Sequence, residues 1–222
     1  MPRKSAAKAK TLTIRDMSIL TDLARCRVLS LEQVKVAFWP SAKERTCRER
    51  LAQLEKAGYI AFQTVQGDQP GISLEVFHLA NKGRRWATGP DGPGLDRSII
   101  FETAGKADEI IHQIRTNNVY FTLSETEQAT WRIGDALEIE RGVFQGGGVM
   151  VPDALYIAGD GGEVLEVLIE TDCGSYTAAQ IREKIAAFSG KKSVWICPSG
   201  RDRTLRHYGV AGEIRTYGGD RN

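Results

Sequence analysis

One stretch of the chain suits neither a helix nor a central strand. Between Ala87 and Gly94, three of the eight residues are glycine and two are proline, and both residue types interrupt regular structure. We interpret residues 87–98 as a linker between two domains. With 222 residues, 41% of them hydrophobic, the chain is long enough for both domains to bury a core. The predicted order is a basic flexible arm at 1–12, a first domain at 13–86, the linker, and a second domain at 99–222.

Charge divides at the same place. Residues 1–100 hold 17 of the 30 Lys and Arg but 10 of the 28 Asp and Glu, a net charge of +7. Residues 101–222 therefore hold 13 against 18, a net charge of −5. A basic half suits a polyanion such as nucleic acid, whereas an acidic half can gather carboxylates into a site.

Several classes of protein do not fit this sequence. It has no apolar window of about 18 residues and no apolar run behind its basic start, so we expect no membrane span, no secretory signal and a cytoplasmic location. The four cysteines are far apart and form no C-x-x-C pair, which indicates buried free thiols rather than a zinc cluster or a disulfide framework.

Two capping signatures open the first domain. Thr13 and Ser30 each stand three residues before an acidic or amide side chain, with apolar residues at helical spacing behind them. They predict a helix over 14–25 and a short second helix that ends before Pro40. A third helix is predicted over 42–57, with Ser41 as its cap and Gly58 just past its end.

The residues after the third helix determine the type of domain. Two strand-like runs flank a glycine-containing turn, at 59–65, 66–71 and 73–79. Three helices with a tight turn between the last two, followed by such a hairpin, predict a winged helix-turn-helix. In this architecture the third helix enters the major groove of DNA. The residues predicted to bind DNA are Lys43, Arg45, Thr46, Arg48 and Arg50 of the third helix, with Lys82, Arg84 and Arg85 after the hairpin.

Two other interpretations of the basic helix stay open. Its arginines can pair with neighbouring glutamates as an ordinary solvated face, in this case with Glu44, Glu49 and Glu55. Alternatively, a winged helix can contact another protein, in which case the basic residues would not be needed.

The second domain concentrates carboxylates at the ends of two strands. A helix over 105–122 carries His112, which can orient a site or be an ordinary core residue. Strands at 149–157 and 164–172 follow, joined by a glycine turn, with Asp153 in the first and Glu170 and Asp172 at the end of the second. Such a set can hold Mg²⁺ for phosphodiester hydrolysis. Further elements are predicted as an amphipathic segment at 176–188, a buried strand at 193–197 and a basic helix at 201–208.

The motif Pro152-Asp153 followed by Glu170-x-Asp172 resembles the PD-(D/E)XK nuclease superfamily, in which an aspartate and a Glu-x-Lys dyad hold the metal on a mixed sheet. Position 172 is Asp where the superfamily has Lys, and Lys184 is the nearest replacement. The resemblance implies a catalytic set of Asp153, Glu170, Asp172 and Lys184, with the three carboxylates as metal ligands. In the alternative interpretation, Asp153 and Asp172 simply end strands and Glu170 forms an ion pair with Lys184.

Over about residues 11–190 the chain resembles the replication-relaxation proteins of bacterial plasmids and integrated mobile elements. The motifs that carry the resemblance are Thr13-Ile-Arg-Asp16, Leu29-Ser-Leu-Glu-Gln33, residues 50–59, residues 112–120, Pro152-Asp153, Glu170-Thr-Asp172 and Lys184. It implies an α+β or α/β protein in which a winged helix precedes a mixed-sheet, restriction-endonuclease-like domain.

The same resemblance implies a DNA-binding accessory factor or regulator for plasmid replication, relaxation or mobilisation. Its partners would be double-stranded DNA and relaxase or replication proteins, with a homodimer as a further possibility. Two alternatives are a Mg²⁺-dependent endonuclease or nickase that uses the carboxylate site, and a protein–protein interaction module.

Overall fold

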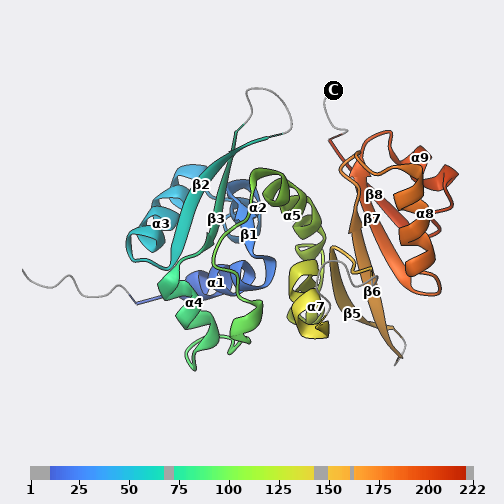
Figure 1. Cartoon of the computed structure of the whole chain (residues 1–222). Coiled ribbons are helices and arrows are strands. Elements are labelled where there is room, and N and C mark those ends of the chain that lie inside the picture. The colour runs from blue at the N-terminus through green and yellow to red at the C-terminus, as the bar shows by residue number, and fades with distance from the viewer. Residues whose placement is uncertain (1–10, 68–72, 143–149, 161–162, 219–222) are drawn as a thin grey trace, which may run out of the picture. The chain divides into compact units, whose positions relative to one another are not determined.

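The computed structural model describes residues 11–67, 73–142, 150–160 and 163–218 (Figure 1). Within the described residues, the chain forms two compact units: residues 11–65 with 73–104, and residues 105–218 together with 66–67. The fold is a mixture of helices and two sheets, one of which is mixed. Most of the predicted basic arm and most of the predicted hairpin turn lie outside the described residues.

The first unit contains the three helices and two strands that the sequence predicts, together with a short strand, a fourth helix and a 3₁₀ turn that it does not. In chain order they are α1 (Ile14–Cys26), β1 (Val28–Ser30), α2 (Leu31–Phe38), α3 (Glu44–Lys56), β2 (Ile60–Gln66), β3 (Ser73–Leu79), α4 (Asn81–Thr88) and η1 (Arg97–Ile99). The sheet has the order β1-β3-β2, and β1 pairs antiparallel with β3.

Two of the three N-caps predicted for the first unit are present in the structure. Thr13 and Ser30 both form complete capping boxes. The prediction that Ser41 caps α3 was wrong. The chain turns at residues 39–42, where Ala42 N donates a hydrogen bond to Trp39 O at 3.2 Å. Lys43 therefore takes the N-cap position, without a side-chain hydrogen bond. Gly58 follows α3 with φ +80°, a conformation that favours glycine, as predicted.

The predicted linker lies within the first unit. Ala87 is buried in α4, and its carbonyl accepts a hydrogen bond from Leu95 N at 3.0 Å. Gly92 packs so closely on Trp86 that an added Cβ would lie 2.0 Å from its carbonyl oxygen. The glycines and prolines therefore let this stretch fold back on α4, and the two units meet in sequence between residues 104 and 105.

The second unit is built on a five-stranded sheet. Its elements are α5 (Ala107–Tyr120), α6 (Glu125–Thr130), β4 (Arg132–Ile133), α7 (Gly134–Arg141), β5 (Ala154–Asp160), β6 (Glu163–Thr171), α8 (Ala178–Ala187), β7 (Lys192–Pro198), α9 (Asp202–His207) and β8 (Glu213–Tyr217). The order is β4-β5-β6-β7-β8, with antiparallel pairing up to β6 and parallel pairing after it. In Figure 1, α5 lies on one side of this sheet and α8 and α9 on the other.

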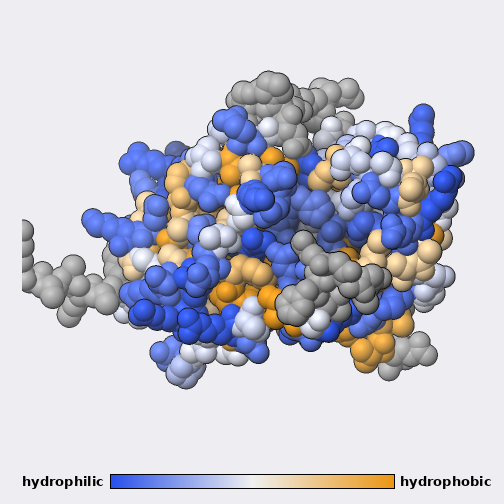
Figure 2. Space-filling view, in the orientation of Figure 1, coloured by the Kyte–Doolittle hydropathy of each residue, from blue (hydrophilic) through white to orange (hydrophobic). Residues whose placement is uncertain are grey.

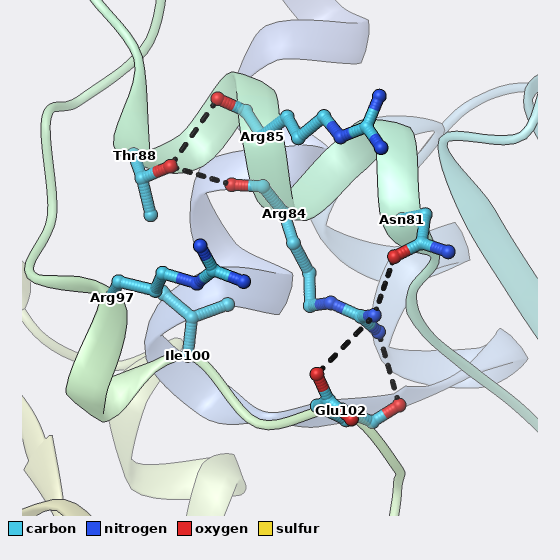
Figure 3. A pocket seen from close by; sticks show the side chains of 7 residues that line it. All are labelled: Asn81, Arg84, Arg85, Thr88, Arg97, Ile100 and Glu102. Atoms are coloured by element: carbon cyan, nitrogen blue, oxygen red, sulfur yellow. Dashed lines mark hydrogen bonds and ion pairs between the residues drawn. The ribbon is translucent and has the colours of Figure 1, made fainter.

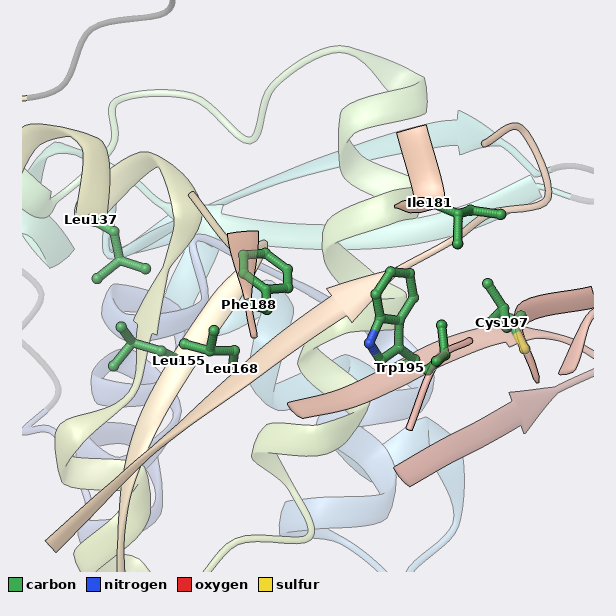
Figure 4. Close-up of a cluster of buried hydrophobic side chains, with 9 residues drawn as sticks. Leu137, Leu155, Leu168, Ile181, Phe188, Trp195 and Cys197 are labelled. Atoms are coloured by element: carbon green, nitrogen blue, oxygen red, sulfur yellow. The ribbon is translucent and has the colours of Figure 1, made fainter. Parts of the chain in front are cut away.

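An apolar cluster joins the sheet to α7 and to the helices that follow β6 (Figure 4). It comprises Leu137, Leu155, Leu168, Ile181, Phe188, Trp195, Cys197, Leu205 and Val210, all 6% exposed or less. Side chains alternate between the faces of a strand, so Glu170 lies on the same face as Leu168. The buried side chain of Glu170 therefore lies on an apolar face, and the free-energy cost of burying it depends on its hydrogen-bond and ion-pair partners.

The four cysteines all lie within the described residues and form no disulfide, and three of them are buried. No helix in the described part of the chain is both long and apolar enough to cross a bilayer.

Candidate functional site

The predicted DNA-binding residues of α3 occupy different environments. Lys43, Arg45, Thr46 and Arg48 are exposed, whereas Arg50 is only partly so. The Arg45 Nε lies 2.7 Å from Glu49 Oε1, and the Arg48 Nε lies 2.6 Å from Glu44 Oε1. Arg48 also forms an ion pair with Glu75 of β3. These pairs are the ones expected of a solvated helix face, but exposed pairs contribute little free energy and exchange partners easily.

Arg50 has a structural partner. Its Nε donates to Asp16 Oδ1 at 2.7 Å, and its Nη2 pairs with the other carboxylate oxygen. Asp16 is 1% exposed and also accepts the capping hydrogen bond from Thr13 N at 2.7 Å. Burial acts to raise the pKa of Asp16, but the hydrogen bonds from Arg50 and Thr13 hold it below its usual value. Arg50 therefore ties α3 to α1 and is not available to a ligand without breaking this pair.

The three cations after the hairpin also differ. The Lys82 Nζ lies 4.2 Å from the ring centroid of Tyr59, in a cation–π contact. Arg84 donates to Asn81 Oδ1 at 2.7 Å and to the backbone carbonyl of Glu102 at 3.1 Å. Arg85 is exposed and forms no ion pair with the residues that the structure describes.

In the second unit, Asp153 stands just before β5, with its side chain 17% exposed. Its Oδ2 accepts a hydrogen bond from Thr171 N at 2.6 Å and lies 3.2 Å from His112 Nε2. Burial acts to raise the pKa of Asp153, but the hydrogen bond and charge of His112, together with the charge of Lys184, hold it below the usual value. Asp153 is therefore an ionised carboxylate next to an imidazole.

Glu170 is completely buried and shares one oxygen between two partners. The Tyr176 hydroxyl donates to Glu170 Oε1 at 2.6 Å, and Lys184 forms an ion pair with the same oxygen. The other oxygen, Oε2, is buried without a hydrogen-bond partner. Burial, followed by the negative charge of Asp153, raises the pKa of Glu170 to about 8, although Lys184 and Tyr176 oppose the shift. The Glu170–Lys184 pair that sequence reasoning kept as an alternative is therefore present.

Asp172 has its own set of partners. The Arg201 Nε donates to its Oδ2 at 2.8 Å, and Gly174 N donates to its Oδ1 at 2.8 Å. Tyr176 N donates to the same Oδ1 at 3.3 Å. Asp172 is 0% exposed, so these contacts fix the loop after β6. Its predicted role as a metal ligand stays a prediction, and its contacts do not favour it.

His112 extends from α5 toward the end of β6. Its Nε2 lies 3.1 Å from Thr171 O and 3.2 Å from Asp153 Oδ2. Both neighbours accept hydrogen bonds, so Nε2 carries the proton. Burial acts to lower the pKa of His112, but Asp153 and the Thr171 carbonyl raise it above its ordinary value. Thr116, one turn along α5, contacts the Thr171 hydroxyl at 2.8 Å, which anchors the helix to this strand.

The structure thus brings together two of the three predicted carboxylates, Asp153 and Glu170, with Lys184 beside them. Sequence reasoning missed the hydroxyl of Tyr176, whose only signal was its position four residues after Asp172. It also missed the guanidinium of Arg201, which lies 29 residues after Asp172 and gave no local signal. Within the described residues, no group of three or more His, Cys, Asp or Glu side chains is arranged so that it could hold a metal ion. Any divalent ion would therefore depend on two carboxylates.

Comparison with curated proteins and with solved structures found no significant match. A family model described as replication-relaxation matches residues 20–190, which is most of the chain and includes α2, α3, β6 and α8. The chain belongs to the replication-relaxation family.

Proposed function

We propose that the first unit binds duplex DNA as a winged helix, with α3 directed toward the major groove. The observation that carries the proposal is the row of exposed cations at the start of α3, formed by the N-cap Lys43 with Arg45 and Arg48. The order α1, α2, α3 and then the strands β2 and β3 supports it, as does the basic charge of residues 1–100.

The glutamates beside these arginines do not prevent DNA binding. The Arg45 and Glu49 side chains are 87% and 57% exposed, so their attraction is screened by water and salt. A phosphate group can replace such a glutamate and releases counterions from the DNA when it does. The glutamates therefore pair with the arginines in the free protein, and DNA phosphates replace them in the complex.

A duplex-binding assay with a matched pair of variants tests this proposal. Arg45→Gln and Lys56→Gln each remove one exposed cation from α3, the first near its start and the second in its last turn. We expect Arg45→Gln to weaken binding and to reduce the slope of log affinity against log salt by about 0.9. Lys56→Gln should leave both unchanged. Equal effects of the two variants would show attraction by overall charge, and wild-type protein without any affinity would rule the proposal out.

Membership of the replication-relaxation family suggests the setting for this activity. We propose that the protein serves replication, relaxation or mobilisation of a bacterial mobile element as an accessory factor or regulator. We propose relaxase or replication proteins, and a second copy of this chain, as its further partners.

A second candidate function is Mg²⁺-dependent cleavage of DNA by the second unit. The observation that favours it is the buried Glu170 Oε2, which has no hydrogen-bond partner and lies near the Asp153 charge. A buried carboxyl group that lacks a partner for one oxygen can exchange its proton for a cation, and Mg²⁺ needs only one or two carboxylates besides water and phosphate oxygens. Asp153 and Glu170 would hold the ion, which would orient water and stabilise charge on the phosphate.

The chain around these carboxylates supports the same candidate. The antiparallel pair β5–β6 is followed by α8 and then by β7, parallel to β6, in keeping with the mixed sheet of PD-(D/E)XK nucleases. Lys184 of α8 supplies a positive charge next to Glu170, although it comes later in the chain than the lysine of the dyad. His112 orients Asp153 through its Nε2.

Nicking of supercoiled plasmid in EDTA, Mg²⁺ or Mn²⁺ tests the second candidate. Asp153→Asn and Glu170→Gln should abolish metal-dependent nicking and leave duplex affinity in place. Glu166→Gln is the matched control, because Glu166 lies on the same strand but is exposed and paired with Lys191. It should cut as wild type does. Absence of cleavage by the wild type in every metal would leave the protein as a DNA-binding factor alone.

A further inference from the structure

We propose that a hollow on the first unit, formed by α4 and residues 97–102, binds a phosphate group. The hollow has a volume of about 310 Å³. Three arginines line it, Arg84, Arg85 and Arg97, together with Asn81, Thr88 and Glu102. Figure 3 shows the Arg97 side chain directed into the space beside Arg84, with Arg85 extended along α4. The surface around α4 is strongly hydrophilic in Figure 2.

The described residues do not balance the positive charge in this hollow. Arg85 and Arg97 are exposed and form no ion pair with described residues. The only carboxylate in the lining is Glu102, whose Oε1 lies 3.8 Å from Arg84 Nη2 and whose side chain is 79% exposed. Three guanidinium groups against one exposed carboxylate favour an anion that carries about two charges, such as a phosphate monoester or pyrophosphate.

Part of the hollow is organised before any anion arrives. Arg84 is only 20% exposed, and hydrogen bonds to Asn81 Oδ1 and to the carbonyls of Leu79 and Glu102 hold its guanidinium in place. A fixed guanidinium loses little side-chain freedom when it binds. Those hydrogen bonds already engage both terminal nitrogens, so Arg84 offers an anion its fixed positive charge, whereas Arg97 and Arg85 offer the planar forks of donors that match phosphate oxygens. Arg84 thus forms the fixed wall of the hollow, and Arg97 and Arg85 supply charge that is free to close on the anion.

The same phosphate chemistry can come from two sources. One is the backbone of nucleic acid, in which case the hollow adds a contact to the DNA interface proposed for α3 and rests on that proposal. The other is a free nucleotide or polyphosphate, in which case the hollow is independent of DNA binding. Sequence alone pointed to Arg84 and Arg85, whereas Arg97 joins them only through the fold of residues 89–102.

Calorimetric titration of the full chain with pyrophosphate tests the hollow without DNA. We expect saturable binding by the wild type and about tenfold weaker binding by Arg97→Gln, because a charge-assisted hydrogen bond is lost. Arg85→Gln should weaken binding in the same direction. Lys56→Gln, which removes an exposed cation that does not line the hollow, should bind as wild type does. Thermal unfolding of each variant checks that the fold is intact.

Two results would overturn the proposal: wild-type protein that shows no saturable binding of pyrophosphate, or equal weakening by Arg97→Gln and Lys56→Gln. The source of the phosphate follows from labelled duplex in the same buffer. If Arg97→Gln weakens duplex binding as well and duplex displaces pyrophosphate, the backbone is the source. If only pyrophosphate binding weakens, the ligand is a free phosphate compound. Failure of the wild type to bind duplex would refute the role of α3 and leave the pyrophosphate result standing.

Discussion

Removal of the Lys184 ammonium tests whether the buried Glu170 depends on it. Glu170 is 0% exposed, and its pKa lies at about 8 rather than at the ordinary 4.5. Because the folded pKa is raised, the stability linked to this group is greatest at low pH and is lost as the pH rises through about 8. The rise spans about 3.5 pKa units, which corresponds to roughly 5 kcal/mol at most. Wild-type stability should therefore fall between the ordinary pKa and about 8.

The substitution Lys184→Met should make the free energy of unfolding depend more steeply on pH. At about pH 6 the Glu170 carboxyl is already protonated. The variant then loses only a hydrogen bond, which should lower the free energy of unfolding by about 1–2 kcal/mol. Above the wild-type pKa the carboxyl must either ionise without its partner or keep its proton, and the cost grows by about 1.4 kcal/mol per pH unit. Near pH 9.5 the variant should be about 3–4 kcal/mol less stable than the wild type.

Urea unfolding followed by circular dichroism at both pH values measures these costs. Lys191→Met is the control, because Lys191 pairs with the exposed Glu166 at 3.3 Å and its loss should cost under about 0.5 kcal/mol at either pH. The double variant Glu170→Gln with Lys184→Met should abolish the extra cost at high pH. A cost for Lys184→Met that does not change with pH would refute the coupling between the two groups.

Three further predictions concern other parts of the fold. Asp16→Asn should lower the unfolding free energy by about 2–4 kcal/mol in urea titrations, and the stability that this carboxylate provides should be lost as the pH falls through its lowered pKa. Gly92→Ala should cost about 1–3 kcal/mol and lower the melting temperature, because its Cβ would lie 2.0 Å from Trp86 O. Arg201→Met should cost about 3–5 kcal/mol, because it leaves Asp172 buried without its cation, and a variant as stable as wild type in urea would show that the loop hydrogen bonds suffice.

Elements whose ends are set by neighbouring residues could be predicted from the sequence. The caps at Thr13 and Ser30 are made by side chains three residues from their partners, so the sequence displays them directly. β1 could not be found in this way, since it has three residues and its partner strand begins 43 positions after it ends. α4 was hidden by Gly83, which lowers helix propensity but is required because an added Cβ would lie 2.1 Å from Tyr59 O.

The candidate site was predictable to the extent that it follows strand geometry. Asp153 and Glu170 come together because antiparallel strands bring their ends side by side, with Ala154 opposite Ile169. The ion pair of Asp172 with Arg201 was not predictable, because Arg201 lies 29 residues further along and reaches Asp172 only after β7 has paired with β6. A motif thus places residue types at one sheet edge, whereas the tertiary fold selects which of them stay available.

The same principle governs the cations of the first unit. Arg50 looks like a DNA contact in the sequence, yet it pairs with Asp16 across 34 residues. Arg48 pairs with Glu75 as well as with its helix neighbour, so α3 presents less unbalanced charge than its composition indicates. Arg85 and Arg97 carry charge that no described carboxylate balances directly. If the DNA backbone supplies the phosphate that the hollow binds, the salt dependence of duplex binding is divided between α3 and the hollow beside α4. A combined Arg45→Gln and Arg97→Gln variant should then lower its slope by about 1.8, the sum of two independent phosphate contacts.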